Sequence, residues 1–505
     1  MADTKLVKIK LVKNEILTAD VLSESYVIDG TTYTIGTGVE KYVDSNNELQ
    51  TITSISTEGE IKNGSGTVIT EITNLNQWTP IGIYEEGIIN RPFKGVFDGK
   101  DYTISGIYIY TDKAYQGLLG IVENGMVKNV NVSLSYIYSL GRDLWCYTDG
   151  DIYTTRVGSV VGYGINSSIS NSSSSAFVQG IRHVGGIVGC LEAGSTINNC
   201  KNFGVVIGND TDIEVSDGVF WSAIQIGGVC GAFQDEFEEM IMRNCVNYGF
   251  VYNEIDQVGG VAGFVRNGRV VDSMNYGYVI GSSSTGGIVG LLGESTVGQV
   301  KNYGFVYAMK EPSGHGGGIV GSVWLGGYNC IIYNSCNLGS VYGGNSGGII
   351  AYCGTGMILN CWNEGYVDGS GIIAYGNSIV YNCYNIGNVG HFGIVAGMTL
   401  HAEIRNVYNL NANVASIYGT YNDGTNNHVP IIENIFGVNG KSIVSNNWND
   451  LDLSTCKTFD PTTLTFSDGT TLLSALNAWV DANKSTYPEL KNWVMGPNGY
   501  PILDI

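Results

Sequence analysis

Residues 185–204 contain two phrases that recur along the chain and decide its fold. Gly185–Gly189 reads Gly-Gly-Ile-Val-Gly, and the segment after it ends in Asn202-Phe203-Gly204. The asparagine of this Asn-x-Gly phrase occurs eight times, as Asn202, Asn247, Asn275, Asn302, Asn337, Asn363, Asn385 and Asn409. Successive copies lie 22 to 45 residues apart, which is the spacing of proteins built from stacked repeats.

The residues around each asparagine alternate in character as they do in a β-strand. In seven copies a valine such as Val206 follows four residues later, and a small residue such as Cys200 or Cys245 usually lies two residues before. These positions share one face of an extended strand, whereas the residue after the asparagine points the other way. Because that residue varies from Phe203 to Glu364, we expect it to face outward.

A repeat of this size cannot bury a core alone, so neighbouring copies must stack. Stacked parallel strands lie about 4.8 Å apart, and the asparagines would then form a ladder of hydrogen-bonded side-chain amides. Asparagine also tolerates a left-handed backbone, so the pattern leaves open whether these residues point inward or occupy a corner. A leucine-rich repeat is the rival architecture, but its leucine skeleton is absent.

Several glycine-rich motifs in the first third of the chain strengthen this interpretation. They are Trp78–Gly82 (Trp-Thr-Pro-Ile-Gly), Phe93–Gly99 (Phe-Lys-Gly-Val-Phe-Asp-Gly), Tyr102–Gly106 and Gly117–Gly120. With the Gly-Gly-Ile-Val-Gly copies, residues 50–505 resemble the GLUG-motif repeat family of bacterial and phage surface proteins. The resemblance implies an all-β, single-stranded, right-handed parallel β-helix that serves as an adhesive or structural stalk. It transfers no catalytic residue.

The pattern predicts three segments. Residues 1–48 do not match the repeat and contain a hairpin pattern around Asp29-Gly30, which indicates a small β attachment module or cap. Residues 49–445 form the β-helix, beginning with a first coil near residues 51–75. Residues 446–505 form a C-terminal cap with one amphipathic helix over 470–484, because Leu472, Leu476 and Trp479 recur at helical spacing.

Composition limits the partners and the compartment. The chain has 46 acidic and 25 basic residues and a net charge of −21, which disfavours nucleic acids and anionic membranes. Four of the 11 cysteines, Cys200, Cys245, Cys361 and Cys383, share one repeat position, so we expect them to be reduced and inward. No Cys/His spacing suits zinc, no cofactor is expected, and the five histidines, isolated from one another, are expected at surface or corner positions.

Two insertions near residues 133–157 and 207–226 interrupt the repeat. Insertions in a solenoid collect at one edge and often carry function. Their aromatic residues are our candidates for binding a glycan or receptor: Tyr136, Tyr138, Trp145, Tyr147, Phe220 and Trp221. Oxygen ligands at Asp210, Asp212, Glu214 and Asp217 are weak candidates for calcium, since they lack the full EF-hand spacing.

These observations favour a non-enzymatic structural or adhesive protein. The leading hypothesis is a phage virion fibre, tail or decoration protein that binds a host-surface polysaccharide and attaches to other virion proteins through its N-terminal module. In residues 1–17 lysines interrupt the apolar residues, which is the pattern of a strand rather than of a signal peptide. This fits a virion protein that leaves its host cell by lysis. A bacterial cell-surface adhesin and a polysaccharide-degrading tailspike are the alternatives. The sequence leaves the oligomeric state open, with a homotrimer as one option.

Overall fold

The structure is a computed structural model. It describes residues 77–505 except 86–88, 134, 140–154, 209–212, 217–218, 222–223, 236–237, 311–312, 324–329, 399–401, 412, 418–429 and 445–450. For residues 84–85, 89–90, 213–216, 219–221 and 398, and for five short strands between residues 25 and 63, only the backbone is described.

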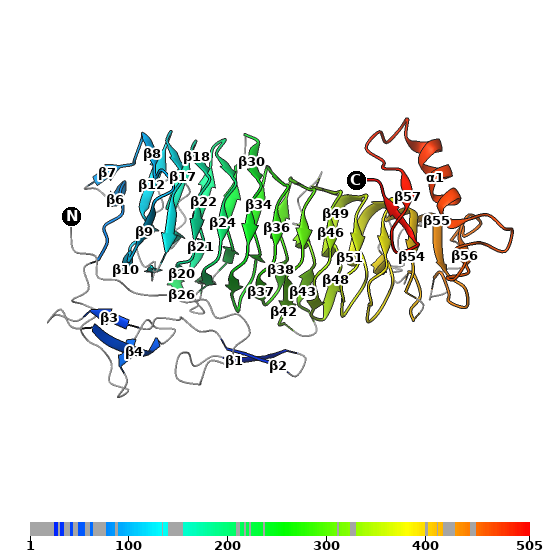
Figure 1. Cartoon of the computed structure of the whole chain (residues 1–505), viewed down its shortest axis with the longest axis horizontal. Helices are drawn as coiled ribbons and strands as arrows, with labels where there is room; N and C mark the ends of the chain where they lie inside the picture. Colours follow the sequence, from blue (N-terminus) through cyan, green and yellow to red (C-terminus); the bar gives the residue numbers. More distant parts are fainter. Residues whose placement is uncertain are drawn as a thin grey trace. The chain divides into compact units, whose positions relative to one another are not determined.

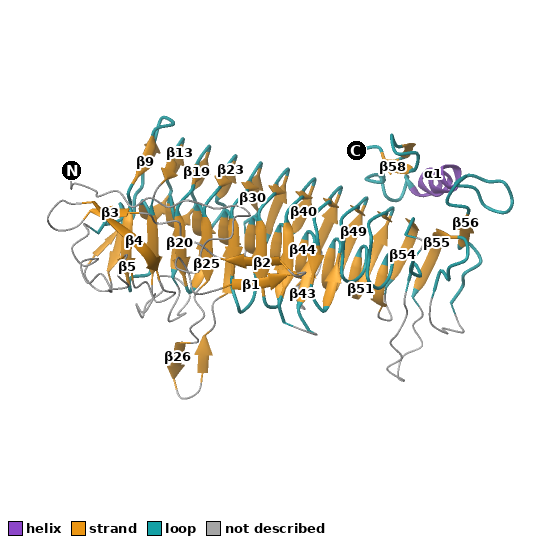
Figure 2. Ribbon diagram, turned by 60° about the horizontal axis from the view of Figure 1, so that its bottom comes forward, coloured by secondary structure: helices purple, strands orange, loops and turns teal. Residues whose placement is uncertain are grey.

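The chain forms a parallel β-helix and divides into two compact units. Unit 1 contains residues 1–264 and 276–278, and unit 2 contains residues 265–275 and 279–505. In each unit the strands of one coil pair in parallel with those of the next (Figures 1 and 2). The predicted fold class is confirmed.

The strands before residue 64 pair in antiparallel fashion. β1 (Ser25–Ile28) and β2 (Thr31–Thr34) form the predicted hairpin, while β3 (Lys41–Val43), β4 (Leu49–Ile55) and β5 (Ile61–Asn63) form a separate sheet. The prediction that residues 51–75 begin the first coil is therefore wrong for β4 and β5. Alternation of apolar and polar residues reads the same in parallel and antiparallel strands.

Unit 1 begins with partial coils and continues with coils of five strands. The entry strands are β6 (Ile83–Glu85), β7 (Ile89–Arg91), β8 (Val96–Asp98) and β9 (Thr103–Ser105). Successive coils contain β10 (Tyr108–Thr111), β11 (Tyr115–Gln116), β12 (Leu119–Glu123), β13 (Met126–Lys128) and β14 (Asn131–Ser133); β15 (Tyr136–Ser139), β16 (Arg156–Gly158), β17 (Val161–Ile165), β18 (Ser168–Ser170) and β19 (Ser173–Ser174); and β20 (Phe177–Gly180), β21 (Arg182–Gly185), β22 (Val188–Glu192), β23 (Thr196–Asn198) and β24 (Lys201–Asn202). They are followed by β25 (Val205–Gly208), the hairpin β26 (Ile213–Ser216) and β27 (Val219–Trp221), β28 (Ile224–Gly227), β29 (Cys230–Gln234), β30 (Met240–Arg243), β31 (Val246–Asn247), β32 (Phe250–Tyr252) and β33 (Val258–Gly259).

Unit 2 has the same pattern of strands, and its later coils merge neighbouring strands into longer ones. β34 (Ala262–Arg266) and β37 (Tyr278–Gly281) contain residues of both units. The coils contain β35 (Gly268–Val271) and β36 (Met274–Asn275); β38 (Ser284–Gly286), β39 (Val289–Gly293), β40 (Thr296–Gly298) and β41 (Lys301–Asn302); β42 (Phe305–Ala308), β43 (His315–Gly317), β44 (Val320–Val323), β45 (Cys330–Tyr333) and β46 (Cys336–Asn337); β47 (Val341–Tyr342), β48 (Asn345–Gly347), β49 (Ile350–Leu359) and β50 (Trp362–Asn363); β51 (Ile373–Tyr381) and β52 (Tyr384–Asn385); β53 (Val395–Met398) and β54 (Glu403–Asn409); and β55 (Ile431–Val438) and β56 (Lys457–Phe459).

The Gly-Gly-x-x-Gly phrase is required by close backbone approaches. A Cβ on Gly186 would lie 2.2 Å from the Gly228 carbonyl oxygen and 2.5 Å from Cγ of Asn202. A Cβ on Gly189 would lie 2.4 Å from the backbone nitrogen of Val157. Only glycine fits such positions, so the phrase marks where the backbones of neighbouring coils lie close together and where the inner asparagine packs on them.

The asparagines of the Asn-x-Gly phrase point inward and form the predicted line of amides in each unit. In unit 1, Nδ2 of Asn202 donates to Oδ1 of Asn247 at 2.9 Å. In unit 2, the amides of Asn275, Asn302, Asn337, Asn363, Asn385 and Asn409 donate each to the next over 2.8–3.0 Å. Because these side chains are no more than 1% exposed, the question left open by the sequence is settled in favour of the interior.

A second series of asparagines occupies a corner of the coil, three residues before the inner series. Asn129, Asn171 and Asn199 of unit 1 have φ values of 49–56°, and Asn334, Asn360, Asn382 and Asn406 of unit 2 have values of 48–59°. Their side chains also bond from coil to coil, as where Nδ2 of Asn199 donates to Oδ1 of Asn171 at 2.9 Å. The two roles that one asparagine could play are thus divided between two residues.

The interior and exterior positions agree with the predicted alternation. Cys200, Cys245, Cys361 and Cys383 form no disulfide bond and are fully buried, and burial raises the pKa of Cys200 to about 12. The residue after each inner asparagine points outward, and in unit 1 these residues form a stack of rings. The ring centroid of Phe203 lies 4.9 Å from that of Tyr248, which lies 5.1 Å from that of Tyr276. These rings are 38–41% exposed, but stacking leaves mainly their edges to solvent.

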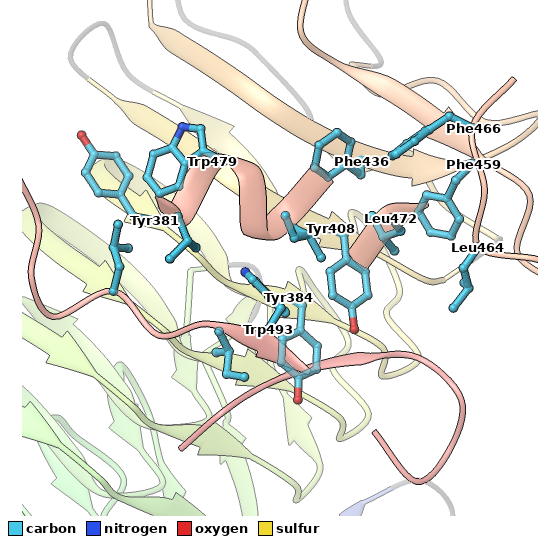
Figure 3. Close-up of a cluster of buried hydrophobic side chains, with 14 of the residues drawn as sticks. Tyr381, Tyr384, Tyr408, Phe436, Phe459, Leu464, Phe466, Leu472, Trp479 and Trp493 are labelled. Atoms are coloured by element: carbon cyan, nitrogen blue, oxygen red, sulfur yellow. The ribbon is translucent and has the colours of Figure 1, made fainter. Parts of the chain in front are cut away.

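The C-terminal segment of unit 2 packs on the sides of the last coils. Helix α1 (Leu472–Asn483) begins after the N-cap Thr471 and buries Leu472, Leu476, Trp479 and Val480, which confirms the predicted amphipathic helix. It lies beside aromatic side chains of β51, β52, β54 and β55, together with the hairpin β57 (Trp493–Met495) and β58 (Pro501–Leu503) (Figure 3). Parallel pairing continues to β56, so the predicted end of the β-helix at residue 445 is too early.

Candidate functional site

Tyr136 and Tyr138 lie in the regular strand β15, not in an edge loop. Each is 1% exposed, and their rings belong to columns that run from coil to coil. The ring of Tyr136 lies 5.9 Å from Tyr108 and 5.2 Å from Phe177, and that of Tyr138 lies 5.2 Å from Tyr110. The prediction that these two rings form an exposed binding surface is therefore corrected, because side chains of the neighbouring coils cover their faces.

The remaining candidates lie in segments whose side chains are not described. Trp145, Tyr147, Asp210, Asp212 and Asp217 are outside the described residues. Phe220 and Trp221 belong to β27 and Glu214 to β26, for which the backbone alone is described. Glycan binding by these aromatic residues and calcium binding by these acids remain predictions. Among the described residues, no group of three or more His, Cys, Asp or Glu could hold a metal ion.

A cavity at the first coil of unit 1 offers a different candidate site. Residues 77–82 lie along the edge of this coil, since the backbone nitrogen of Trp78 donates to the Tyr108 carbonyl at 2.8 Å. The Gln77 side chain makes the two hydrogen bonds that the backbone of a neighbouring strand would make. Its Nε2 donates to the Tyr110 carbonyl, and its Oε1 accepts from the Tyr110 nitrogen, both at 2.9 Å. The edge of β10 is thereby held in place beside the cavity.

The cavity measures about 350 Å³ and combines aromatic walls with polar groups. Trp78, Tyr110 and Tyr115 supply rings, while Gln77, Gln116 and Lys113 supply amide and ammonium groups, with Thr79, Pro80, Ile83, Ile109 and Thr111 completing the lining. The indole nitrogen of Trp78 donates to the Leu118 carbonyl at 3.1 Å, which fixes the ring. Apolar walls with a few polar groups suit a ligand such as a sugar, with one apolar face and hydroxyl groups at its edge. The sequence identifies Trp78 as part of a repeat motif, but it does not indicate that Trp78 lines a cavity.

A partly buried ion pair lies behind Tyr115. The guanidinium of Arg156 is 3.3 Å from Oε1 of Glu192, and it lies over the Tyr163 ring at 4.1 Å. Glu192 also accepts from the Tyr163 hydroxyl at 2.5 Å and from Gln234 at 3.3 Å. Burial raises the pKa of Tyr163 well above its ordinary value, so its hydroxyl stays protonated and donating.

This cluster suits a structural role better than catalysis. A glycosidase needs two carboxyl groups flanking the bond that it cleaves. The described groups that contact the Glu192 carboxylate are donors from Arg156, Tyr163, Cys190 and Gln234, and none of them is a second carboxylate. We therefore interpret the cluster as the support that orients Tyr115.

His183 occupies a buried corner next to this cluster. It is 2% exposed and has a φ of 55°. The equivalent position holds Arg156 in the preceding coil and Gln225 and Gln257 in the two following coils. Burial is the main factor that lowers the pKa of His183 well below its ordinary value, with further contributions from the charges of Arg182 and Arg156. The corner position agrees with the sequence, whereas the burial does not follow from an isolated histidine.

Replacing His183 with glutamine is expected to remove part of the acid sensitivity of unit 1. In the folded protein His183 stays neutral, while the unfolded chain binds a proton below a pH of about 6.5. Its contribution to stability is therefore complete above that pH and falls by up to about 1.4 kcal/mol per pH unit below it, until the lowered folded pKa is reached. Urea unfolding followed from pH 7.5 to 5 should show a shallower decline for His183→Gln. Parallel curves for the two proteins would contradict the assignment.

Comparison with protein-family models, with curated proteins and with solved structures found no match to this chain. Among the described residues, no helix combines the length and apolar character needed to cross a membrane.

Proposed function

We propose that this protein is a non-enzymatic β-helical display protein that binds a polysaccharide through the cavity beside Trp78 and Tyr110. The observation that carries the proposal is the combination in this cavity of three aromatic side chains with amide and ammonium groups. Sugars are bound in this way because their C–H faces pack on rings while their hydroxyl groups bond to polar neighbours. The repeated coils around the site supply a rigid support.

The setting that we propose is a phage virion, as a fibre, tail or decoration protein, with a bacterial cell-surface adhesin as the alternative. Support comes from the ten described cysteines, none of which forms a disulfide bond and nine of which are buried. Unpaired thiols are typical of proteins that assemble in a reducing cytoplasm. The antiparallel strands β1–β5 differ from the repeat, and we assign them to attachment to other assembly proteins.

Tyr110→Ala is expected to weaken binding to host-surface polysaccharide by about two- to tenfold. The loss of one ring that packs on a sugar costs about 0.5–1.5 kcal/mol. Tyr102→Ala is the matched control, because Tyr102 is 75% exposed and does not line the cavity. Binding of wild type and variants to purified host glycans can be compared by biolayer interferometry.

Two results would redirect the proposal. Equal binding by Tyr110→Ala, with loss of binding in Trp145→Ala/Trp221→Ala, would move recognition to the two insertions. The release of new reducing ends from the glycan would instead favour the polysaccharide-degrading tailspike.

A further inference from the structure

In unit 2 the corner asparagines bind an extended peptide, which is part of the chain's own C-terminal segment. Nδ2 of Asn360 donates to the Glu489 carbonyl at 2.9 Å, and its Oδ1 accepts from the Lys491 nitrogen at 3.2 Å. Nδ2 of Asn382 donates to the Lys491 carbonyl at 2.9 Å. Each of these amides also bonds to the corner amide of the preceding coil at 2.8–3.0 Å. One row of amides thus holds the coils together and bonds to alternate residues, Glu489 and Lys491, of a segment laid across them.

In unit 1 the same row is exposed. Asn171 and Asn199 have the left-handed backbone of the unit 2 corners and the same bonds from coil to coil, over 3.2 and 2.9 Å. Both side chains are exposed to solvent. Each amide nitrogen uses one of its two hydrogens in the row, so one N–H remains for an incoming peptide carbonyl, which is the bond that Asn360 makes to Glu489.

The residues beside this row favour a particular kind of peptide. The positions that flank the corner in the coils of Asn171, Asn199 and Asn244 are Ser170, Ser173, Asn198, Lys201, Arg243 and Val246. They contain two positive charges and no carboxylate, in a chain whose net charge is −21. Lys201 is exposed, and no described carboxylate pairs with it.

We propose that Asn171 and Asn199 bind the backbone of an extended acidic peptide segment of a partner protein, with Lys201 as a charge partner. A second copy of the chain's own C-terminal segment is a poorer occupant. In unit 2 that segment places Trp493 on Tyr384 and Tyr408, which stand directly before the inner asparagines of their coils. The equivalent residue in unit 1 is Lys201, so the aromatic support is missing and a charge replaces it.

The test uses the full chain and a fluorescein-labelled nonapeptide of alternating glutamate and valine. Asn171→Gly/Asn199→Gly removes both amides, while glycine keeps the left-handed backbone. The matched control is Asn124→Gly/Asn166→Gly, which removes a similar exposed amide pair, bonded at 2.6 Å, from a different corner in the coil of Asn171 and the coil before it. Fluorescence anisotropy should show binding at least tenfold weaker for the first pair and unchanged for the control. Lys201→Gln should weaken binding and reduce its dependence on salt.

Hydrogen exchange of the wild-type chain provides a measurement that needs no variant. Bound peptide should slow exchange between residues 196 and 203 and leave the cavity at Trp78 unaffected, which separates this site from the proposed glycan site. Absence of binding at about 1 mM peptide overturns the proposal. Binding that survives the loss of both amides, or protection elsewhere in the chain, overturns it as well.

Discussion

Asn337→Ala is expected to lower the free energy of unfolding of unit 2 by about 3–5 kcal/mol. Asn337 lies in the middle of the inner row, where it accepts from Asn302 and donates to Asn363, both at 2.8 Å. It also donates to the Gly339 carbonyl at 3.0 Å. Alanine would leave an N–H of Asn302 and the Oδ1 of Asn363 buried without these partners, at about 1–3 kcal/mol each, and would open a small cavity.

The control for this prediction is Asn388→Ala, since Asn388 belongs to the same unit but is exposed. Its effect should stay within about 0.5 kcal/mol. Urea unfolding monitored by circular dichroism, together with hydrogen exchange of β41, β46 and β50, would measure both variants. If Asn337→Ala lowered the free energy of unfolding no more than the control does, the inner row of amides would contribute little to the stability of unit 2.

Trp493→Ala is expected to release the C-terminal segment from unit 2, at a cost of about 3–5 kcal/mol. The indole is 2% exposed, packs 5.7 Å from Tyr384 and 5.6 Å from Tyr408, and donates to Oδ1 of Asn382 at 2.6 Å (Figure 3). Removing it creates a large cavity under β57 and deprives Asn382 of a donor. Because the coils bond to one another independently of this segment, their strands should stay folded.

Hydrogen exchange can distinguish release from general unfolding. In Trp493→Ala, protection should fall in α1 and β57–β58 and persist in β46 and β50. Trp493→Phe keeps a ring but loses the bond to Asn382, so it should show a smaller effect. Equal loss of protection across unit 2 would mean that the segment and the coils unfold as one.

Repetition explains why the coils could be predicted. Each copy of the Asn-x-Gly phrase repeats the same pattern of residues. Because side chains alternate between the two faces of a strand, this pattern places Cys200 and Val206 inside and Phe203 outside. Parity could not decide the direction of Asn202 itself, because an inward amide and a corner amide fit the same pattern. The corner residue Asn199 was missed since its series includes residues other than asparagine, such as Asp272 and Gln299.

The candidate site was harder to predict, because it depends on contacts that the repeat does not encode. Tyr136 and Tyr138 resemble the aromatic decoration of a loop, and only the register with Tyr108 and Tyr110 shows that they continue columns of rings. The cavity needs Gln77 to pair with Tyr110, 33 residues away. Docking of the C-terminal segment joins Asn360 to Glu489, 129 residues apart, with no periodic signal at either end.

The two rows of amides have opposite polarity. Inner side chains donate toward higher residue numbers, as from Asn337 to Asn363, whereas corner side chains donate toward lower ones, as from Asn382 to Asn360. Aligned hydrogen bonds polarise one another, so either row alone would accumulate a dipole as coils are added. Because the rows oppose each other within each unit, their dipoles largely cancel. Lengthening the stack therefore adds bonds without building up charge at its ends.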